Sequence, residues 1–251
     1  MAREVVVQID GDRATIALNR PDKLNALDLG LVASFEEAAC EVAADSRVAV
    51  VVVRGHGRSF CAGLDLDMFA AEGMSMEFYR HQERGFRVLE TMDKTVIAAL
   101  HGYCLGGGVQ LAAACDVRVG SSNAVIGLPA VEEGLFPGMA PYRLPRLIGK
   151  GRAASLILTG RSLTAQEAER IGLIDHVVDA DDFDAQLAGL VDEYARAPRE
   201  AAAASKRLMA LSYDAPFGEA LEASEELLQA CLRAPEVARA RAAWSQRATR
   251  R

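Results

Sequence analysis

A continuous apolar run between Arg47 and Arg54 constrains the fold more than any other feature of the sequence. Most of its members are valines, which favour extended backbone and packing within a sheet. A strand with one face in water alternates apolar and polar residues, whereas this run has no polar position. The run therefore predicts a strand covered on both faces, as in a parallel sheet flanked by helices.

Strand-like and helix-like segments alternate around this run. Asp28 can cap a helix that continues to about Ala44, because apolar residues recur there at helical spacing. A second helix is expected over about 74–92. The alternation predicts an α/β fold for the first two-thirds of the chain. The other strands are expected at 5–9, 14–18, 95–100, 117–119, 124–126 and 175–178.

The last third of the sequence has a mainly helical pattern. Alanine-rich segments follow Pro198 and Pro216, so we divide the chain into an α/β core at 1–195 and a helical region at 196–251. One apolar face of the helical region is too long for a lone domain of this size to cover, which predicts contacts with other subunits. The face carries Leu221, Leu227, Leu228 and Leu232.

Charge and cysteine content argue against several classes of function. The 28 basic and 35 acidic residues give a net charge of −7, so nucleic acid is not an expected partner. The longest apolar run has six residues, against roughly 18 for a bilayer span. No membrane partner and no signal peptide are expected, and the location is predicted to be cytoplasmic. The five cysteines and four histidines show no metal-ligand spacing, so no metal is predicted.

Two glycine-bearing loops, residues 59–66 and 101–108, are the main candidates for a functional site. Each follows an expected strand and precedes an expected helix. The first N–H groups of a helix lack internal partners, and glycine lets a ligand approach them. Either loop alone is more simply a tight turn, but two such loops aimed at one point would form an oxyanion hole. A dinucleotide-binding loop is not expected, because Phe60 stands where its third glycine belongs.

Together with other motifs, these loops resemble the enoyl-CoA hydratase/isomerase (crotonase) superfamily. The similarity runs from about residue 5 to 179 and more loosely through the C-terminal helices. It is carried by Leu18-Asn19-Arg20-Pro21-Asp22-Lys23-Leu24-Asn25-Ala26-Leu27, Phe60-Cys61-Ala62-Gly63-Leu64-Asp65, Val96-Ile97-Ala98-Ala99-Leu100-His101-Gly102 with Gly106-Gly107-Gly108, Gly134-Leu135-Phe136-Pro137, Leu158-Thr159-Gly160 through Ala168, and Gly172-Leu173-Ile174.

The resemblance implies a fold, a substrate class and an assembly. The fold would be a crotonase-like ββα spiral core with a helical C-terminal trimerisation region. The substrate would be an acyl-CoA thioester, with no cofactor beyond the CoA that it carries, and the assembly a homotrimer or a dimer of trimers. The thioester oxygen would accept hydrogen bonds from the peptide N–H groups of Leu64 and Gly107, which stabilise an enolate.

The same resemblance assigns substrate contacts to the first two motifs. The adenosine and pantetheine parts would lie against Lys23, Leu24, Ala26, Ala62, Asp65 and Leu66. Asp65 has a second interpretation of equal weight, because an aspartate at this place can cap the helix that follows.

The sequence departs from the family pattern at its acidic positions. Typical hydratases carry one glutamate two residues after the triple glycine and a second at the start of the next active-site loop. Those positions are Gln110 and Ala130 here, and we keep both as substrate-contacting residues. The acid that other branches use after the Gly-Leu-Phe-Pro stretch is replaced by Gly138. Gln110 can orient a water but cannot take its proton at neutral pH.

Glu133 is the preferred substitute for the missing acids. It follows Ala130 by three residues, which on a helical turn is nearly the same face. Glu132, His101, Tyr103 and Tyr142 remain alternatives, although a packing role is favoured for His101, Tyr103 and Tyr142.

Three functions stay open at this point. The first is an enzyme of the hydratase/isomerase class that stabilises a thioester enolate, with efficient hydration not expected. The second is a decarboxylase or isomerase on the same scaffold, and the third is a non-catalytic acyl-CoA-binding protein. One fold hosts many reactions, so the acyl group and the reaction that follows enolate stabilisation also stay open.

Overall fold

The structure, a computed structural model, describes residues 3–248. Its strands are β1 (Val5–Asp10), β2 (Arg13–Leu18), β3 (Val50–Gly55), β4 (Thr95–Leu100), β5 (Tyr103–Leu105), β6 (Val117–Ser121), β7 (Val125–Gly127), β8 (Ser162–Thr164) and β9 (His176–Val178). Its α-helices are α1 (Leu29–Ala44), α2 (Leu66–Glu72), α3 (Met76–Thr91), α4 (Gly107–Ala113), α5 (Ala140–Ile148), α6 (Lys150–Thr159), α7 (Ala165–Arg170), α8 (Phe183–Ala195), α9 (Arg199–Leu211), α10 (Phe217–Arg233) and α11 (Pro235–Ala248). Two short 3₁₀ helices are η1 (Pro21–Lys23) and η2 (Pro129–Glu133).

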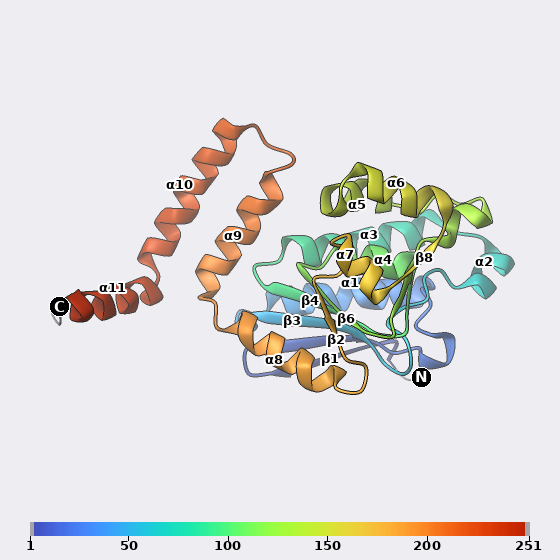
Figure 1. Cartoon of the computed structure of the whole chain (residues 1–251), viewed down its shortest axis with the longest axis horizontal. Helices are drawn as coiled ribbons and strands as arrows, with labels where there is room; N and C mark the ends of the chain where they lie inside the picture. Colours follow the sequence, from blue (N-terminus) through green and yellow to red (C-terminus); the bar gives the residue numbers. More distant parts are fainter. Residues whose placement is uncertain (1–2, 249–251) are drawn as a thin grey trace. The chain divides into compact units, whose positions relative to one another are not determined.

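Two compact units divide the chain, with the boundary between Tyr194 and Ala195. The first unit contains a six-stranded sheet in the order β1-β2-β3-β4-β6-β9, in which only β1 and β2 are antiparallel. A three-stranded sheet has the order β5-β7-β8. Figure 1 shows the larger sheet of this unit with helices around it. The mixed α/β architecture is the predicted one.

The two sheets arise from a repeated ββα turn of the chain. β4 of the larger sheet leads into β5 of the smaller sheet and then into α4, and β6 leads into β7 and η2. The same turn follows β3, since Cys61 forms a single parallel bridge with Cys104 of β5 before α2 begins. Successive turns therefore bring the starts of α2, α4 and η2 to one region.

The strand predicted to be covered on both faces is confirmed. Val50–Val53 of β3 are each at most 8% exposed. Val51 and Val53 belong to the main core, which also contains residues of α1 and α3. These two helices pack through Phe35 and Phe86, whose rings meet edge to face with centroids 6.0 Å apart.

Helix starts follow the capping residues. α1 begins after Asp28, whose carboxylate accepts the N–H of Leu31 at 2.8 Å, as predicted. α3 begins at Met76 rather than near residue 74, because the Ser75 hydroxyl caps it.

Strand β8 was not predicted. Only its central residue is buried, and three residues are too few for an alternating pattern to be recognised.

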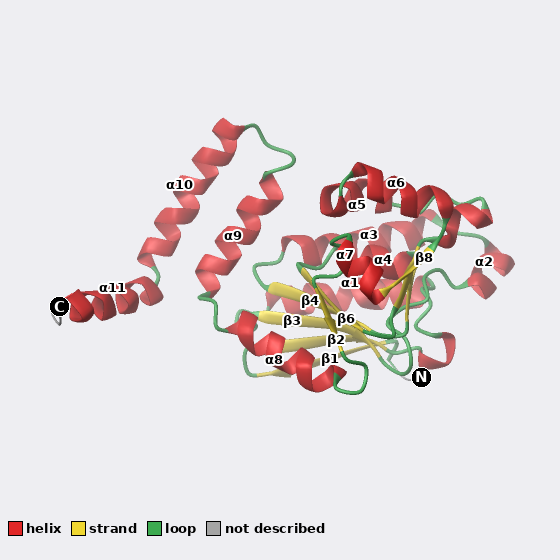
Figure 2. Cartoon of the chain, viewed as in Figure 1, coloured by secondary structure: helices red, strands yellow, loops and turns green. Residues whose placement is uncertain are grey.

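The second unit contains the helices α9, α10 and α11, and Figure 2 shows the described residues after Ala195 as helix and loop. Several large apolar side chains of α10 are exposed within this chain. They include Phe217, Leu228 and Leu232, which are 82%, 58% and 60% exposed.

Among residues 3–248, none of the helices has both the length and the apolar character that crossing a bilayer requires.

Asn25 holds the loop that follows β2 in its unusual shape. The residue has a positive φ of 57° and is fully buried. Its amide nitrogen donates to the carbonyls of His56 and Ser59 at 2.9 and 2.8 Å, and its amide oxygen accepts the N–H of Arg20 at 2.9 Å. One side chain thus joins this loop to the loop that leads into the Cys61 bridge.

Replacing Asn25 with alanine should lower the free energy of unfolding by about 2–4 kcal/mol. The change removes the donor from the buried bond to Ser59 and from the part-buried bond to His56. It also puts alanine in the left-handed region without the hydrogen bonds that hold Asn25 there. Urea denaturation measures the loss. Asn123→Ala is the matched control, because Asn123 is exposed and its side chain bonds only to the Ser121 hydroxyl, so its cost should be about 1 kcal/mol or less. Equal costs for both variants would refute the role given to Asn25.

Candidate active site

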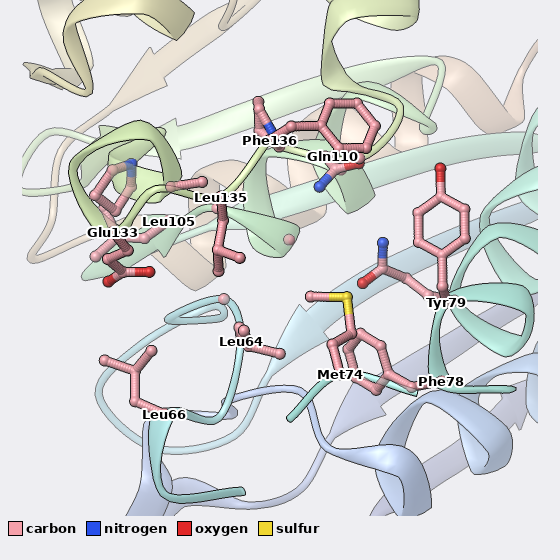
Figure 3. Close-up of a pocket in the computed structure, with 18 of the residues that line it drawn as sticks. Leu64, Leu66, Met74, Phe78, Tyr79, Leu105, Gln110, Glu133, Leu135 and Phe136 are labelled. Atoms are coloured by element: carbon pink, nitrogen blue, oxygen red, sulfur yellow. The ribbon is translucent and has the colours of Figure 1, made fainter. Parts of the chain in front are cut away.

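A cavity of about 500 Å³ lies in the first unit where the repeated turns converge. Four segments line it: residues 62–66, 74–82, 105–110 and 129–138. Figure 3 shows that apolar side chains supply most of its wall. The residues concerned include Leu64, Met74, Phe78, Leu105, Leu135 and Phe136.

The first glycine-bearing loop leaves the N–H of Leu64 without an acceptor among the described residues, and Leu64 lines the cavity. Gly63 has a φ of 91°, and its carbonyl accepts the N–H of Leu27 at 2.6 Å. The carbonyl of Leu27 in turn accepts the N–H of Asp65 at 2.9 Å. These two bonds flank Leu64, and within residues 3–248 its N–H meets no acceptor. The donor is therefore available to a ligand in the cavity that Leu64 lines.

The second loop supplies an equivalent donor at Gly107. Gly106 has a φ of 50° and its N–H donates to the carbonyl of Gly127 at 2.8 Å. Gly107 is the first residue of α4, so its N–H belongs to the helix end that has no internal acceptor. No other group in the described part of the chain accepts it. Leu64 and Gly107 thus line one cavity, and each has an N–H group without an acceptor in the described part of the chain.

Backbone contacts fix the spacing between the two loops. The N–H of Cys61 donates to the carbonyl of Tyr103 at 3.0 Å, and the N–H of Leu105 donates to the carbonyl of Cys61 at 2.9 Å. A Cβ on Gly108 would lie 2.5 Å from the Cys61 carbonyl oxygen. α4 can approach this closely only because residue 108 is glycine.

The two positions at which the resemblance would place glutamates, 110 and 130, both line the cavity, and neither carries an acid. Gln110 on α4 is 5% exposed, and Ala130 stands on η2. Gly138 also lines the cavity. A Cβ there would lie 2.9 Å from Oε1 of Gln110, so the amide of Gln110 occupies the space into which a side chain at 138 would project.

Glu133 is the carboxylate that lines the cavity. η2 is a 3₁₀ turn, in which residues three apart eclipse, and this explains why Ala130 and Glu133 both reach the cavity. Glu133 is exposed, and Figure 3 places it beside Leu66 and Leu105, on the side away from Gln110.

The four alternative candidates lie outside the cavity lining. His101 approaches the Gly57 carbonyl at 3.1 Å and the ring of Phe183, and burial lowers the pKa of its imidazole. Tyr103 is 44% exposed on β5. The Tyr142 ring stacks under a guanidinium, and Glu132 extends toward Gly160. The structure brings none of the four together with Leu64 and Gly107.

Two of the six positions expected to contact CoA, Ala62 and Leu66, line the cavity. Leu24 lies next to it, because its carbonyl accepts the N–H of Ala62 at 3.0 Å, whereas Ala26 is buried. Lys23 is exposed and pairs with the carboxylate of Asp67. Lys23 is thus a cation that is paired with a residue in the first turn of α2.

Asp65 performs the capping role that the sequence left open. Its carboxylate accepts the N–H groups of Asp67 and Met68 at 3.1 and 3.2 Å and pairs with Arg20 at 3.0 Å. Burial alone would raise the pKa of Asp65, but the bonds from Met68 and Arg20 outweigh it and lower the pKa. Asp65 therefore acts on the site by fixing the start of α2.

Sequence reasoning missed the contribution of α3 to the cavity. Tyr79 and Gln82 line it, one turn apart on this helix. Gln82 is 5% exposed in a row of buried residues that are otherwise apolar or glycine. A polar residue on the buried face of an amphipathic helix is the signal that could have identified this wall.

A buried ion cluster stands behind Tyr79. Arg143 of α5 donates to Glu83 at 2.7 Å and to Glu90 at 2.6 Å. Burial and the charge of Glu83 raise the pKa of the Tyr79 hydroxyl above its ordinary value, against the opposing effect of Arg143. Tyr79 is therefore neutral at physiological pH.

The titratable groups of residues 3–248 offer no cluster of His, Cys, Asp and Glu suited to a metal ion. Burial raises the pKa of Cys61 to about 12, so this thiol next to the cavity stays protonated. The groups available for chemistry in the cavity are thus backbone N–H donors, two amides, one phenol and one carboxylate.

Comparison with known proteins relates this arrangement to a family. Residues 10–248 match the family model described as enoyl-CoA hydratase/isomerase. The short-chain-enoyl-CoA hydratase of Clostridium acetobutylicum is 40% identical over 181 residues, which cover 70% of this chain and 69% of that protein. The crotonyl-CoA hydratase of Syntrophomonas wolfei is 37% identical over 185 residues, 71% and 70% of the two chains.

Solved structures extend the similarity to nearly the whole chain. An enoyl-CoA hydratase from Thermoplasma volcanium has a TM-score of 0.90 and 33% identity, and the match covers 97% of this chain and 98% of that one. A Thermobifida fusca protein in complex with CoA has a TM-score of 0.85 and 30% identity, covering 94% and 95%.

Proposed function

Because the chain belongs to the enoyl-CoA hydratase/isomerase family, we propose that its cavity binds an acyl-CoA and that Leu64 and Gly107 donate to the thioester oxygen. The proposal is supported by two residues that line one apolar cavity and whose N–H groups have no acceptor among the described residues. Removing the α-proton of a thioester moves negative charge onto its carbonyl oxygen. Fixed donors that meet this charge are worth about 3–4 kcal/mol each in comparable sites.

Hydration requires more than the stabilisation of an enolate. Hydration of a 2-enoyl-CoA needs a base that polarises water and an acid that protonates the α-carbon. Gln110 and Ala130 provide neither group, while the backbone donors are kept. We therefore propose an acyl-CoA enzyme whose turnover of simple enoyl thioesters is slow, with Glu133 as the carboxylate that could take part.

The CoA portion would extend from the cavity along the loops that carry its expected contacts. Ala62 and Leu66 support this path by lining the cavity. Lys23 would exchange its pairing with Asp67 for a phosphate of CoA. The reaction would need no cofactor beyond the CoA of the substrate, and the enzyme would act in the cytoplasm.

Titration calorimetry with butyryl-CoA and with free CoA tests the binding step. Butyryl-CoA offers the thioester oxygen and a short apolar chain, so it should bind at least tenfold more tightly than CoA, a difference of about 1.4 kcal/mol. Equal affinities would overturn the assignment of the cavity to the acyl group. Turnover assays with enoyl and carboxylated acyl-CoA esters then distinguish the reactions, and binding without any turnover would indicate a non-catalytic protein.

We also propose a homotrimer or a dimer of trimers. The support is the exposed apolar face of α10, including Phe217, Leu228 and Leu232, since a face of this kind usually marks an interface. Light scattering at micromolar concentration should give three or six times the 26.8 kDa mass of one chain. A monomer mass would contradict the proposed assembly.

A further inference from the structure

A buried amide with an unused nitrogen lines the cavity. Oε1 of Gln110 accepts the N–H of Met139 at 3.0 Å. A backbone N–H can only donate, so this bond fixes the orientation of the amide and directs Nε2 away from Met139. Within the described residues Nε2 meets no acceptor, although the side chain is only 5% exposed. Figure 3 shows the nitrogen of Gln110 on the side of the cavity.

The surroundings hold this amide in place. The point where a Cβ of residue 138 would stand lies 2.9 Å from Oε1 and 3.3 Å from Nε2 of Gln110, and 3.4 Å from Cε2 of Tyr79. Two groups, the Gln110 amide and the Tyr79 ring, therefore converge where Gly138 leaves room, and its φ of 48° favours glycine there. The amide cannot swing into that space without meeting the phenol ring.

The Gln110 amide and the Tyr79 hydroxyl, the two polar groups at this end of the cavity, can both act as hydrogen-bond donors. Nε2 carries two hydrogens, and the hydroxyl of Tyr79, which has no partner in the described part of the chain, is neutral. Nε2 is not among the buried side-chain atoms of the described residues that lack a partner, so it is accessible from the cavity that Gln110 lines. A ligand oxygen in the cavity could therefore accept from it.

The charge near these donors favours a neutral acceptor. Glu83 and Glu90 pair with Arg143, and Glu90 also pairs with Arg87 at 3.1 Å, so the cluster behind Tyr79 is balanced in charge. At the Tyr79 hydroxyl, however, the negative charge of Glu83 outweighs the effect of Arg143. A carboxylate of the ligand beside this hydroxyl would be repelled by Glu83, whereas a carbonyl oxygen would not. The donors are thus better matched to a ketone than to an acid.

The position of Gln110 sets which acyl atom it can reach. Gly107 and Gln110 lie three residues apart on α4, which separates them by about 4.5 Å along the helix axis and places them on the same face. With the thioester oxygen on the N–H of Gly107, the amide lies further along the acyl chain. We propose, on the premise of the acyl-CoA function above, that Nε2 of Gln110 donates to an oxygen on the β-carbon, so that the site selects 3-oxoacyl thioesters.

Calorimetry on a matched pair of ligands tests this inference. Butyryl-CoA and acetoacetyl-CoA have the same chain length and differ by the β-carbonyl. The wild-type protein should bind acetoacetyl-CoA about tenfold more tightly. Gln110→Met keeps the length of the side chain and removes its hydrogens, so it should lose most of this preference while its affinity for butyryl-CoA stays within about twofold.

Two further variants isolate the donor. Gln110→Glu can still accept the N–H of Met139 but has no hydrogen to donate at neutral pH, so it should lose the preference as well. Gln8→Met makes the same change as Gln110→Met at an exposed residue of β1 that does not line the cavity, and it should keep the preference. If Gln110→Met fails to fold in a thermal melt, Gln110→Glu supplies the answer.

The outcomes separate this inference from the function on which it rests. Failure of butyryl-CoA to bind the wild-type protein would overturn the acyl-CoA function itself. Binding of both esters with the same preference in wild type, Gln110→Met and Gln110→Glu would overturn only the role of Gln110. Tighter binding of malonyl-CoA than of acetoacetyl-CoA would show that the site selects an anion, against the neutral acceptor inferred here.

Discussion

The purified protein should hydrate crotonyl-CoA several orders of magnitude more slowly than an efficient enzyme. Positioned proton transfer contributes roughly 10²–10⁴-fold per group, and Gln110 and Ala130 remove both usual groups. The double variant Gln110→Glu/Ala130→Glu should raise the rate by at least a hundredfold. Both positions line the cavity, and a glutamate at 110 can keep the bond to the N–H of Met139. The loss of absorbance of the enoyl thioester measures the rate.

Variants at two neighbouring residues, Glu132 and Glu133, control this experiment. Glu133→Gln removes the carboxylate that lines the cavity, and it should abolish any residual hydration that depends on this group. Glu132→Gln removes an exposed carboxylate outside the lining and should change nothing. Wild-type turnover near the upper end of typical values, about 10³ s⁻¹, would show that the catalytic acids lie elsewhere.

Substitution of Gly108 with alanine should weaken butyryl-CoA binding by about tenfold. The new Cβ would lie 2.5 Å from the carbonyl oxygen of Cys61 and 3.0 Å from its Cβ. Backbone and Cβ atoms cannot rotate away, so α4 would have to move from the Cys61 loop. That movement changes the distance between the N–H groups of Gly107 and Leu64. A lost hydrogen bond to the neutral thioester oxygen costs about 0.5–1.5 kcal/mol, which is up to about tenfold in affinity.

Gly151→Ala is the matched control for this substitution. Gly151 lies in α6 with no heavy atom within 4 Å of the added Cβ. An alanine in a helix interior is favoured over glycine by up to about 1 kcal/mol, so the control should bind butyryl-CoA normally and melt no lower than wild type. Calorimetry and thermal melts compare the two variants. Unchanged binding by Gly108→Ala would refute the role of the close loop contact.

The sequence predicted those parts of the fold and site that depend on local pattern. The start of α1 follows from Asp28 and its apolar spacing, and the doubly covered β3 follows from its valines. The convergence of the two glycine-bearing loops was expected through the family resemblance, and both loops do line one cavity. What these features share is that neighbouring residues along the chain determine them.

Features that depend on distant contacts could not be read in the same way. Asp65 was equally suited to a ligand contact and a helix cap, and only its bond with Arg20, 45 positions earlier, shows how its charge is used. The amide orientation of Gln110 depends on the N–H of Met139 in another segment. Tyr79 reaches the cavity because α3 packs where it does, which no local pattern specifies.

A crystal structure with butyryl-CoA bound tests the central claim most directly. Butyryl-CoA has no double bond to hydrate, so it should remain intact in the site. The thioester oxygen is expected about 2.7–3.2 Å from the backbone nitrogens of both Leu64 and Gly107. An oxygen more than about 3.6 Å from both nitrogens, beyond hydrogen-bond range, would contradict the account.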